Sequence, residues 1–313
     1  MPTEAPDRER HDARPDEAPL PHKVGKLAAE ARFLLKTSRP GFWLTSLWFY
    51  LLPVGGRQVF ASASFWLGAF YVTLPLGMLI YGWNDAVDFE TDRLNPRKDS
   101  FLFGARPSEA QIAGLPLRIA LTQAPFVVLF PWLLGWRAIA WFAALLLATA
   151  LYNWPRIGFK GRAGFDMLNQ VAYLLVFVLS SWLSGVPQAP WFTFVFGALF
   201  AMHSHLFGQI MDHQHDLDAG RRTTSGTLGV RAAKGLMTAL LLSESGILWF
   251  CARNPTLALG LAAGAMWFTL DGIWLWRDRS YSQGQMRLFF LGWNAAALVS
   301  VPWVWKTAAL AAR

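Results

Sequence analysis

The sequence is poor in cysteine and in charge. Only one of its 313 residues is a cysteine, Cys251, so the chain cannot form an intrachain disulfide. Charged residues make up 15% of the chain, against about a quarter in soluble globular domains. Hydrophobic residues make up 54%, and the chain holds 17 Trp and 24 Phe. This composition excludes an ordinary soluble domain and predicts a protein whose solvent is lipid.

The net charge of +8 does not indicate nucleic-acid binding. The basic residues lie in short loops between apolar runs rather than along one helix face, which is typical of topology signals in membrane proteins. We therefore expect a lipid bilayer as a partner and no nucleic acid.

The N-terminal segment differs from the rest of the chain. Residues 1–22 hold Pro, Asp, Glu and Arg with almost no apolar side chains, which predicts a disordered cytoplasmic tail. No apolar core follows these charges, so we expect no cleavable signal peptide. Residues 24–36 have an amphipathic pattern, with Leu27, Phe33, Leu34 and Leu35 among Lys26, Glu30, Arg32 and Lys36, as expected of a helix that lies in the membrane interface.

The remainder of the chain offers nine stretches long and apolar enough to cross a bilayer, for which about 20 residues are needed. They lie near 41–58, 64–83, 115–134, 136–153, 167–185, 190–211, 233–252, 255–276 and 286–305. The predicted fold class is therefore all-α, a polytopic membrane protein of about nine transmembrane helices.

Lys and Arg are distributed unevenly between the two sides of this topology. The side that bears the N-terminus carries 23 of them and the other side carries 5. By the positive-inside rule, this bias places the N-terminus in the cytoplasm, and we expect an integral protein of a bacterial inner membrane.

A stripe of acidic residues follows the second predicted span. If the helix continues, Tyr81, Asp85, Asp88 and Asp92 stand at positions i, i+4, i+7 and i+11 and share one face. Three carboxylates on one face repel each other unless a cation lies between them.

The sixth predicted span ends with the same device. His205, Gln209, Asp212 and Asp216 repeat the spacing, and both stripes end on the cytoplasmic side. Carboxylates from two helices that face one cavity can hold Mg²⁺ ions, whose other positions suit the oxygens of a diphosphate. The alternative interpretation is an ordinary solvated helix end, but matched stripes in a charge-poor membrane protein favour function.

Further candidates lie between and after the stripes. Lys160 and Arg156 follow the fourth span and are suited to binding phosphate oxygens, although the positive-inside rule also accounts for cations in this loop. Four histidines cluster at 203–215, but their spacing does not support a closed zinc site; His205 alone lies on the stripe. Three polar residues in later spans either line an acceptor cavity or pair with neighbouring helices. They are Glu244, Asp271 and Asn294.

These motifs resemble the UbiA superfamily of intramembrane prenyltransferases. Asn84-Asp85-x-x-Asp88-x-x-x-Asp92 is similar to the first Asp-rich motif of that family, and Asp212-x-x-x-Asp216-x-x-x-Gly220 to the second. The nine spans, the Arg39-Pro40 pair before the first span, and Tyr152, Pro155 and Lys160 between the motifs also resemble the family.

The resemblance implies a helical bundle around a central cavity and a Mg²⁺-dependent transfer from an allylic polyprenyl diphosphate to a hydrophobic acceptor. It implies that Asp85, Asp88, Asp92, Asp212 and Asp216 bind Mg²⁺, and we expect Asp85, Asp88, Asp212, Asp216 and Lys160 to be catalytic. We expect the substrate to be bound by Asn84, Asp92, Arg97, Lys98, Tyr152, Arg156, Gln209 and Arg222.

The acceptor class is open between aromatic, carotenoid and other lipid compounds. The Arg106-Pro107 pair stands further along the chain than the Arg-Pro segment of many family members, and the run Asn95-Pro96-Arg97-Lys98 looks closer to members that act on carotenoid or lipid acceptors. A terpene cyclase that uses the same diphosphate site is an alternative, and an ion-coupled transporter is an alternative of another class. In domain terms, the tail at 1–22 precedes a single UbiA-like transmembrane domain at 23–313.

Overall fold

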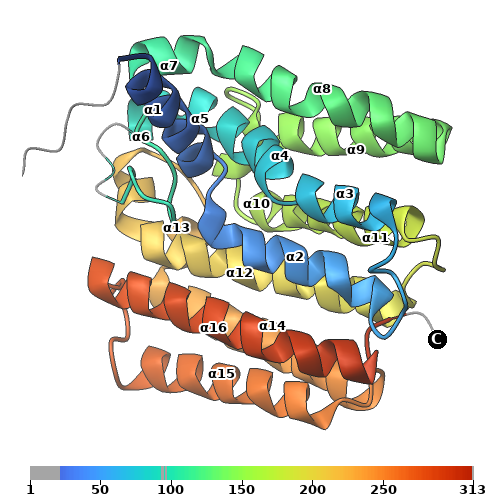
Figure 1. Ribbon diagram of the computed structural model, residues 1–313. Helices are drawn as coiled ribbons and strands as arrows, with labels where there is room; N and C mark the ends of the chain where they lie inside the picture. The colour runs from blue at the N-terminus through green and yellow to red at the C-terminus, as the bar shows by residue number, and fades with distance from the viewer. Residues whose placement is uncertain (1–21, 93–94, 96, 312–313) are drawn as a thin grey trace, which may run out of the picture.

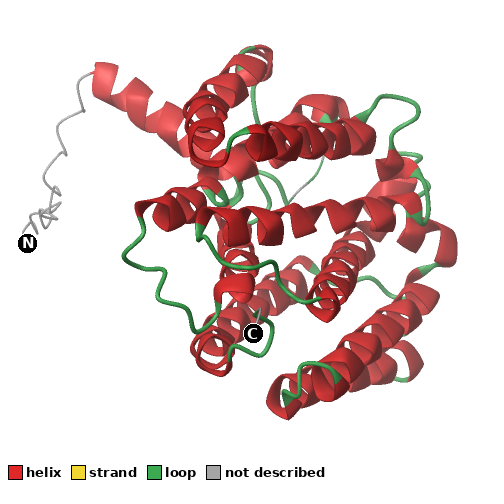
Figure 2. Cartoon of the chain, turned by 90° about the vertical axis from the view of Figure 1, so that its right-hand side faces the viewer, coloured by secondary structure: helices red, strands yellow, loops and turns green. Residues whose placement is uncertain are grey.

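The computed structural model describes residues 22–92, 95 and 97–311, and these residues form helices joined by loops, with no β-strand among them (Figures 1 and 2). The predicted tail therefore lies outside the described residues, apart from its last residue. The N-terminal half holds α1 (His22–Thr37), η1 (Pro40–Phe42), α2 (Trp43–Leu51), η2 (Leu52–Val54), α3 (Ala63–Tyr71), α4 (Leu74–Gly77), η3 (Met78–Gly82), α5 (Trp83–Val87), α6 (Phe89–Asp92), α7 (Glu109–Ala113), α8 (Leu115–Leu134) and α9 (Trp136–Asn153). The C-terminal half holds η4 (Phe159–Gly161), α10 (Phe165–Leu168), η5 (Asn169–Leu174), α11 (Leu175–Leu183), α12 (Trp191–Asp218), α13 (Thr224–Leu228), α14 (Val230–Phe250), α15 (Pro255–Ile273) and α16 (Gln283–Thr307).

Helical segments occupy all nine stretches predicted to cross the membrane, which confirms the all-α fold class. Six described helices are long and apolar enough to span a bilayer by length and composition. They are Ala63–Val87, Leu115–Leu134, Phe165–Leu183, Trp191–Asp218, Pro255–Ile273 and Gln283–Thr307. The protein is thus an integral membrane protein.

Local sequence signals set several helix ends. Asn254 caps the first turn of α15, where Pro255 needs no backbone donor. Ser282 and Gln285 form a reciprocal capping box at the start of α16. Gly135 separates α8 from α9 with φ of 62°, a conformation that glycine adopts without strain.

The helices pack as an elongated bundle in which α8 and α9 form one side and α14 to α16 form the other (Figure 1). The α2 and α12 helices lie between these sides, and α12 contacts α14 while α2 contacts α11 and α16. Large aromatic side chains fill the interior, among which Tyr50, Tyr71 and Phe130 have no exposed surface. Such rings contribute much of the buried apolar area of a core.

The second span is irregular. Pro75 lies in the first turn of α4, and the turn that follows, η3, is a π-helix. A π turn holds one more residue than an α turn, so it changes the register of the side chains that follow. The helix ends at Val87, and Asp88 is its C-cap.

The middle of this span, at the end of α4, touches the chain just before the first span. The backbone of Gly77 lies so close to this segment that a Cβ would stand 2.4 Å from the Ser38 carbonyl oxygen. Next to Ser38, Arg39 adopts a left-handed conformation with φ of 51°. This contact fixes the position from which Arg39 enters the interior.

The predicted interface segment is helical, as α1. Glu30 forms an ion pair with Arg118 of α8, and the Arg118 guanidinium lies 5.6 Å from the centre of the Phe33 ring. Among the residues of α1 whose burial is described, those at 25–29, Ala31 and Arg32 are exposed. That α1 lies in the membrane interface stays a prediction.

Candidate active site

A cavity of about 330 Å³ lies inside the bundle. Its deep end is apolar, with Phe49, Trp141 and Phe200 in its wall. Charged side chains gather at the other end of the cavity, near Asp216. Asp216 stands 16 residues after Phe200 in α12, a distance of roughly 24 Å at the rise of an α-helix. We call this end the cavity mouth. Its polar lining includes Arg39, Asn84, Asp88, Asp92, Arg97, Lys98, Lys160, Asp212, Asp216 and Arg221.

The helix face by which the first motif lines the mouth differs from the predicted face. Asn84, Asp88 and Asp92 line the cavity, whereas Asp85 does not. Successive residues of an α-helix point about 100° apart, so Asp85 faces an adjacent side once Asn84 faces the cavity. The structure therefore does not place Asp85 on the stripe that lines the cavity, because the π turn and the helix end at Asp88 break the regular spacing on which that stripe depended. That Asp85 binds metal and acts in catalysis stays a prediction.

Asp85 instead holds two cations behind the cavity wall. It is 2% exposed, and its Oδ1 accepts from Arg39 Nη2 at 2.9 Å and from Lys98 Nζ at 2.7 Å. It also borders a separate small cavity of about 10 Å³, roughly the space of one water molecule. The geometry makes Asp85 a residue that positions Arg39 and Lys98.

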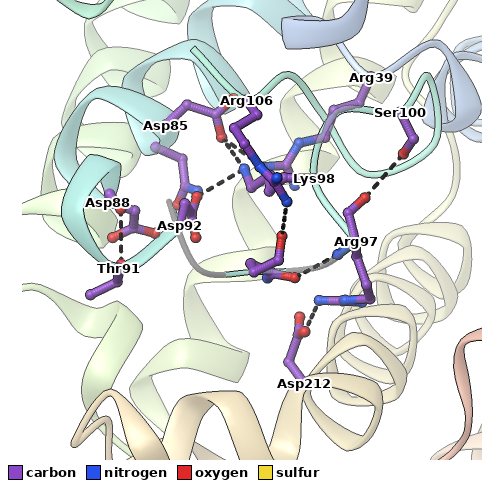
Figure 3. A network of polar contacts seen from close by, with 12 residues as sticks. Arg39, Asp85, Asp88, Thr91, Asp92, Arg97, Lys98, Ser100, Arg106 and Asp212 are labelled. Atoms are coloured by element: carbon purple, nitrogen blue, oxygen red, sulfur yellow. Dashed lines mark hydrogen bonds and ion pairs between the residues drawn. The ribbon is translucent and has the colours of Figure 1, made fainter. Parts of the chain in front are cut away.

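The second motif has the predicted geometry. His205, Gln209, Asp212 and Asp216 all line the cavity from one face of α12. Figure 3 shows Arg97 reaching from the loop after the first motif to Asp212, with which it forms an ion pair across the mouth. The two motifs, more than a hundred residues apart in the chain, thus share one cavity.

Cations pair with each carboxylate of the mouth. Lys98 Nζ lies 2.8 Å from Asp92 Oδ2, and Lys160 forms short contacts with both Asn84 and Asp88. Arg221 joins the motifs, since its guanidinium lies 3.0 Å from Asp88 Oδ1 and 3.3 Å from Asp216 Oδ1. Burial, together with repulsion from other cations, lowers the pKa of the Lys160 ammonium well below its usual value.

Tyr152 and Gln209 also lie where the sequence placed them, in the cavity wall. The Tyr152 ring lies edge-on to His205, with 6.0 Å between ring centres, and Lys160 Nζ stands 5.8 Å from the centre of the same tyrosine ring. His205 lines the cavity as the sequence suggested.

Two of the residues predicted to bind substrate lie outside the cavity. Arg156 is exposed in the turn after α9, and Arg222 is exposed beside the backbone bridge that it forms with Arg162; neither lines the cavity. The arginines that line it are Arg97, which is one of the predicted substrate-binding residues, and Arg39 and Arg221, which are not. Their signals were present, since Arg39 stands in the Arg-Pro pair before the first span and Arg221 follows the second motif.

The polar residues of the later spans pair with neighbours away from the cavity. Glu244 Oε1 lies 2.6 Å from His203 Nδ1, and Asp271 Oδ2 lies 3.0 Å from Lys234 Nζ. Asn294 donates to the backbone oxygen of Phe290 at 2.9 Å. Of the two interpretations left open by the sequence, pairing between or within helices is therefore the one that the structure shows.

The donor set suits a hard divalent cation. Four carboxylates, those of Asp88, Asp92, Asp212 and Asp216, face the cavity, and oxygen donors are the ligands that Mg²⁺ prefers. Within the described part of the chain, no three His, Cys, Asp or Glu side chains are grouped closely enough to hold a metal as they stand. The reason is that lysines and arginines lie between the carboxylates and pair with them. A metal would bind these carboxylates once the cations pair with another anion instead.

Comparison with known proteins gives a consistent family. The model of the UbiA prenyltransferase family matches residues 42–295. A "Lycopene elongase/hydratase" of Corynebacterium glutamicum is 27% identical over 259 residues, which cover 80% of this chain and 88% of that protein. A protein of the same description from Haloarcula japonica is 30% identical over 204 residues, which cover 63% of this chain and 67% of that protein.

A solved structure shares the fold. A UbiA homolog from Archaeoglobus fulgidus, solved bound to DMAPP and Mg²⁺, superposes with a TM-score of 0.64 at 19% sequence identity. The superposition covers 88% of this chain and 99% of that one.

Proposed function

Because the chain belongs to the UbiA prenyltransferase family, and is therefore a prenyl-transferring enzyme of the membrane, we propose that it uses Mg²⁺ to move a prenyl group from an allylic diphosphate to a carotenoid-type polyene. The observation that carries this proposal is the cavity itself: two carboxylate motifs and five cations at its mouth, counted over the described residues, above a deep aromatic interior.

The charge balance of the mouth supports a metal and an anion that bind together. Among the described residues, five carboxylates including Asp85 face five cations at the mouth. A multiply charged diphosphate alone would leave this buried site with excess negative charge, which is unfavourable in a medium of low dielectric. Asp88, Asp92, Asp212 and Asp216 would hold Mg²⁺, which would neutralise the departing diphosphate.

The chain's own cations bind the phosphate oxygens in this proposal. Lys160 and Arg221 turn from Asp88 to the phosphates, and Arg97 turns from Asp212. Asn84, Lys98 and Gln209 border the same volume. Donors fixed in this way stabilise the negative charge that develops on the leaving group.

The transfer then proceeds in the apolar part of the cavity. The bond between the allylic carbon and the diphosphate oxygen breaks, and the electron pair leaves with the diphosphate. A double bond of the acceptor supplies the pair for the new carbon–carbon bond, and the cation left on the acceptor loses a proton or takes up water. Aromatic walls, including Tyr81 and Trp141, exclude bulk water and present π faces to the cation.

Two observations support a polyene as the acceptor: the descriptions of the related proteins and the volume of the cavity. The relatives named above are described as lycopene elongase/hydratase, and the cavity offers an apolar interior. Its volume of about 330 Å³ lies at the lower end of ligand pockets, so one end of a long polyene enters while the rest stays in lipid. The run of residues in the loop after the first motif, Asn95, Arg97 and Lys98 among them, favours the same class of acceptor.

We place both motifs and the N-terminus on the cytoplasmic side of a bacterial inner membrane, within one transmembrane domain at 23–313. The excess of Lys and Arg at the cavity end of the bundle supports this orientation.

Release of pyrophosphate tests the proposal. Purified protein in lipid is incubated with labelled C5 and C10 allylic diphosphates and Mg²⁺, with and without a polyene acceptor. We expect release that requires both the acceptor and Mg²⁺ and that EDTA abolishes. Release without any acceptor would support a terpene cyclase instead, and no release under any condition would reject the diphosphate site.

A further inference from the structure

A buried carboxylate that the proposed reaction does not use lies beside the cavity. Asp166, at the start of α10, has no exposed surface and does not line the cavity. Its Oδ1 accepts from the Met167 backbone N at 2.7 Å and from Thr224 Oγ1 at 2.5 Å. Its Oδ2 accepts from Gln209 Nε2 and from the Thr224 backbone N, both at 2.7 Å.

All four of these donors are neutral, and within the described residues no Lys or Arg pairs with Asp166. A buried carboxylate is stable without a cation when several hydrogen bonds satisfy its oxygens. Its four bonds also join α10 to Gln209 of α12 and Thr224 of α13, which lie more than 40 residues further along the chain. Asp166 is therefore well suited to fix the relative positions of those elements.

The first connection runs through Gln209 to the cavity wall. Gln209 Oε1 accepts from the Ser225 backbone N at 3.0 Å, which orients the amide so that its nitrogen faces Asp166. The same nitrogen lies 2.9 Å from His205 Nε2. Since the amide nitrogen is the donor, His205 Nε2 is the acceptor and the proton of the neutral ring lies on Nδ1.

The second connection runs through Thr224 to the cation that joins the two motifs. Thr224 Oγ1 also accepts from the Gly164 backbone N at 2.8 Å, so the start of α13 is tied to α10 from both directions. The turn between α12 and α13 carries Arg221, which contacts Asp88 and Asp216. One end of this turn is α12 itself, and Asp166 holds the other.

We propose that Asp166 is a positioning residue for diphosphate binding: by holding Gln209 and Thr224, it fixes the turn that presents Arg221 to the two Asp motifs. The inference rests on the proposed function for its substrate. Asparagine at this position would offer an amide N–H₂ group to donors that need an acceptor, so the anchor would open although the side chain has nearly the same shape.

The test compares Asp166→Asn with Asp271→Asn in the full-length protein. Asp271 is a matched control because it is also fully buried and lies away from the cavity. It accepts from the Trp276 backbone N and the Tyr281 hydroxyl, and it pairs with the Lys234 ammonium. We expect Asp166→Asn to weaken binding of an allylic diphosphate with Mg²⁺ by about tenfold per folded protein, the effect of losing one hydrogen bond to a charged group. Asp271→Asn should lower thermal stability and leave that affinity unchanged.

A double-mutant cycle separates positioning from a general loss of structure. If Asp166 acts through Arg221, then Asp166→Asn adds little to the loss of affinity already caused by Arg221→Gln. Fully additive losses would overturn the inference, as would an unchanged affinity in Asp166→Asn.

Hydrogen exchange gives a readout that needs no substrate. The backbone amides of Thr224 and Ser225 donate to Asp166 and Gln209, so Asp166→Asn should speed exchange in the peptide that covers 219–226. Unchanged exchange would reject the anchor even if the diphosphate proposal fails. Conversely, faster exchange in a protein whose wild type binds no diphosphate would reject the proposed function and the positioning role while leaving the anchor in place.

Discussion

Asn84 and Asp85 are neighbours in the chain, yet one faces the cavity and the other faces Arg39 and Lys98 behind its wall. Asp88, one turn later, is where the cations converge, because both Lys160 and Arg221 pair with it. Each carboxylate thus balances two cations, but only Asp88 does so in the cavity wall, where substrate can reach it.

We expect Asp88→Asn to lower the rate of pyrophosphate release by about 100-fold or more, because it removes a carboxylate from the mouth and leaves two buried cations without their partner. Asp218→Asn is the matched control, since Asp218 is exposed on the last turn of α12 and does not line the cavity. Equal rates for Asp88→Asn and wild type would remove Asp88 from the site.

Lys160→Gln should raise the Kd for the allylic diphosphate by about 10- to 150-fold, because a hydrogen bond to a charged group contributes about 1.5–3 kcal/mol. Arg156→Gln alters a cation of the same loop that is exposed and outside the cavity, and should leave the Kd unchanged. Calorimetry on the two variants measures both Kd values. Equal values would mean that Lys160 does not bind the diphosphate and serves only as a positive charge that sets the membrane orientation.

At the scale of single residues, the sequence predicted which types of side chain form the site better than it predicted which individual residues line the cavity. The spacing of His205, Gln209, Asp212 and Asp216 placed a whole stripe correctly, because α12 is a regular helix there. Asp85, Arg156 and Arg222 lie outside the cavity wall, because their positions depend on a π turn and on two loops. The geometry of such segments cannot be predicted from the spacing of residues in the sequence.

At the scale of elements, the second span is the part that local pattern could not describe. Its hydrophobic run predicted a helix, and a helix is present, but Pro75 and the π turn divide it into three pieces. The predicted spans 115–134, 136–153, 233–252, 255–276 and 286–305 agree with single observed helices to within a few residues, because Gly, Pro and charged residues bound these long apolar runs. The predicted spans 41–58 and 167–185 are helical but contain 3-10 turns, and α12 continues seven residues beyond the predicted end at 211.

Gly77→Ala tests the contact that places Arg39. Its Cβ would stand 2.4 Å from the Ser38 oxygen, so the turn that bears Arg39 has to move, at a cost of about 1–3 kcal/mol in stability. We expect a lower melting temperature and weaker diphosphate binding. Gly235→Ala in α14 is the control, because nothing lies within 4 Å of its Cβ, and it should stabilise the protein by about 0.5–1 kcal/mol. If Gly77→Ala leaves both properties unchanged, this contact does not position Arg39.

At the scale of the whole molecule, the mouth and the deep end of the cavity lie toward opposite ends of α12, so the orientation of the bundle decides from which side the diphosphate enters. Hydropathy predicted the bundle, and the distribution of Lys and Arg predicted its orientation, but only folding brings the motifs of two distant helices to one mouth.

Cysteine labelling measures this orientation. In a Cys251→Ser background, Glu109→Cys lies near the mouth in α7, and Gln188→Cys lies in the loop before α12; both positions are exposed. We expect an impermeant maleimide to label Glu109→Cys from the cytoplasmic side and Gln188→Cys from the other. The reverse pattern would contradict the predicted topology and place the mouth outside the cell.

The most direct test of the whole account is to identify the product. Wild-type protein in lipid is given Mg²⁺, a ¹³C-labelled C5 allylic diphosphate and the proposed polyene, and the lipid extract is analysed by mass spectrometry. We predict an acceptor that has gained the labelled prenyl unit, with or without one water, and no such product from Asp88→Asn. Labelled product that lacks the acceptor, or an acceptor that is never extended while the diphosphate is consumed, would contradict the account.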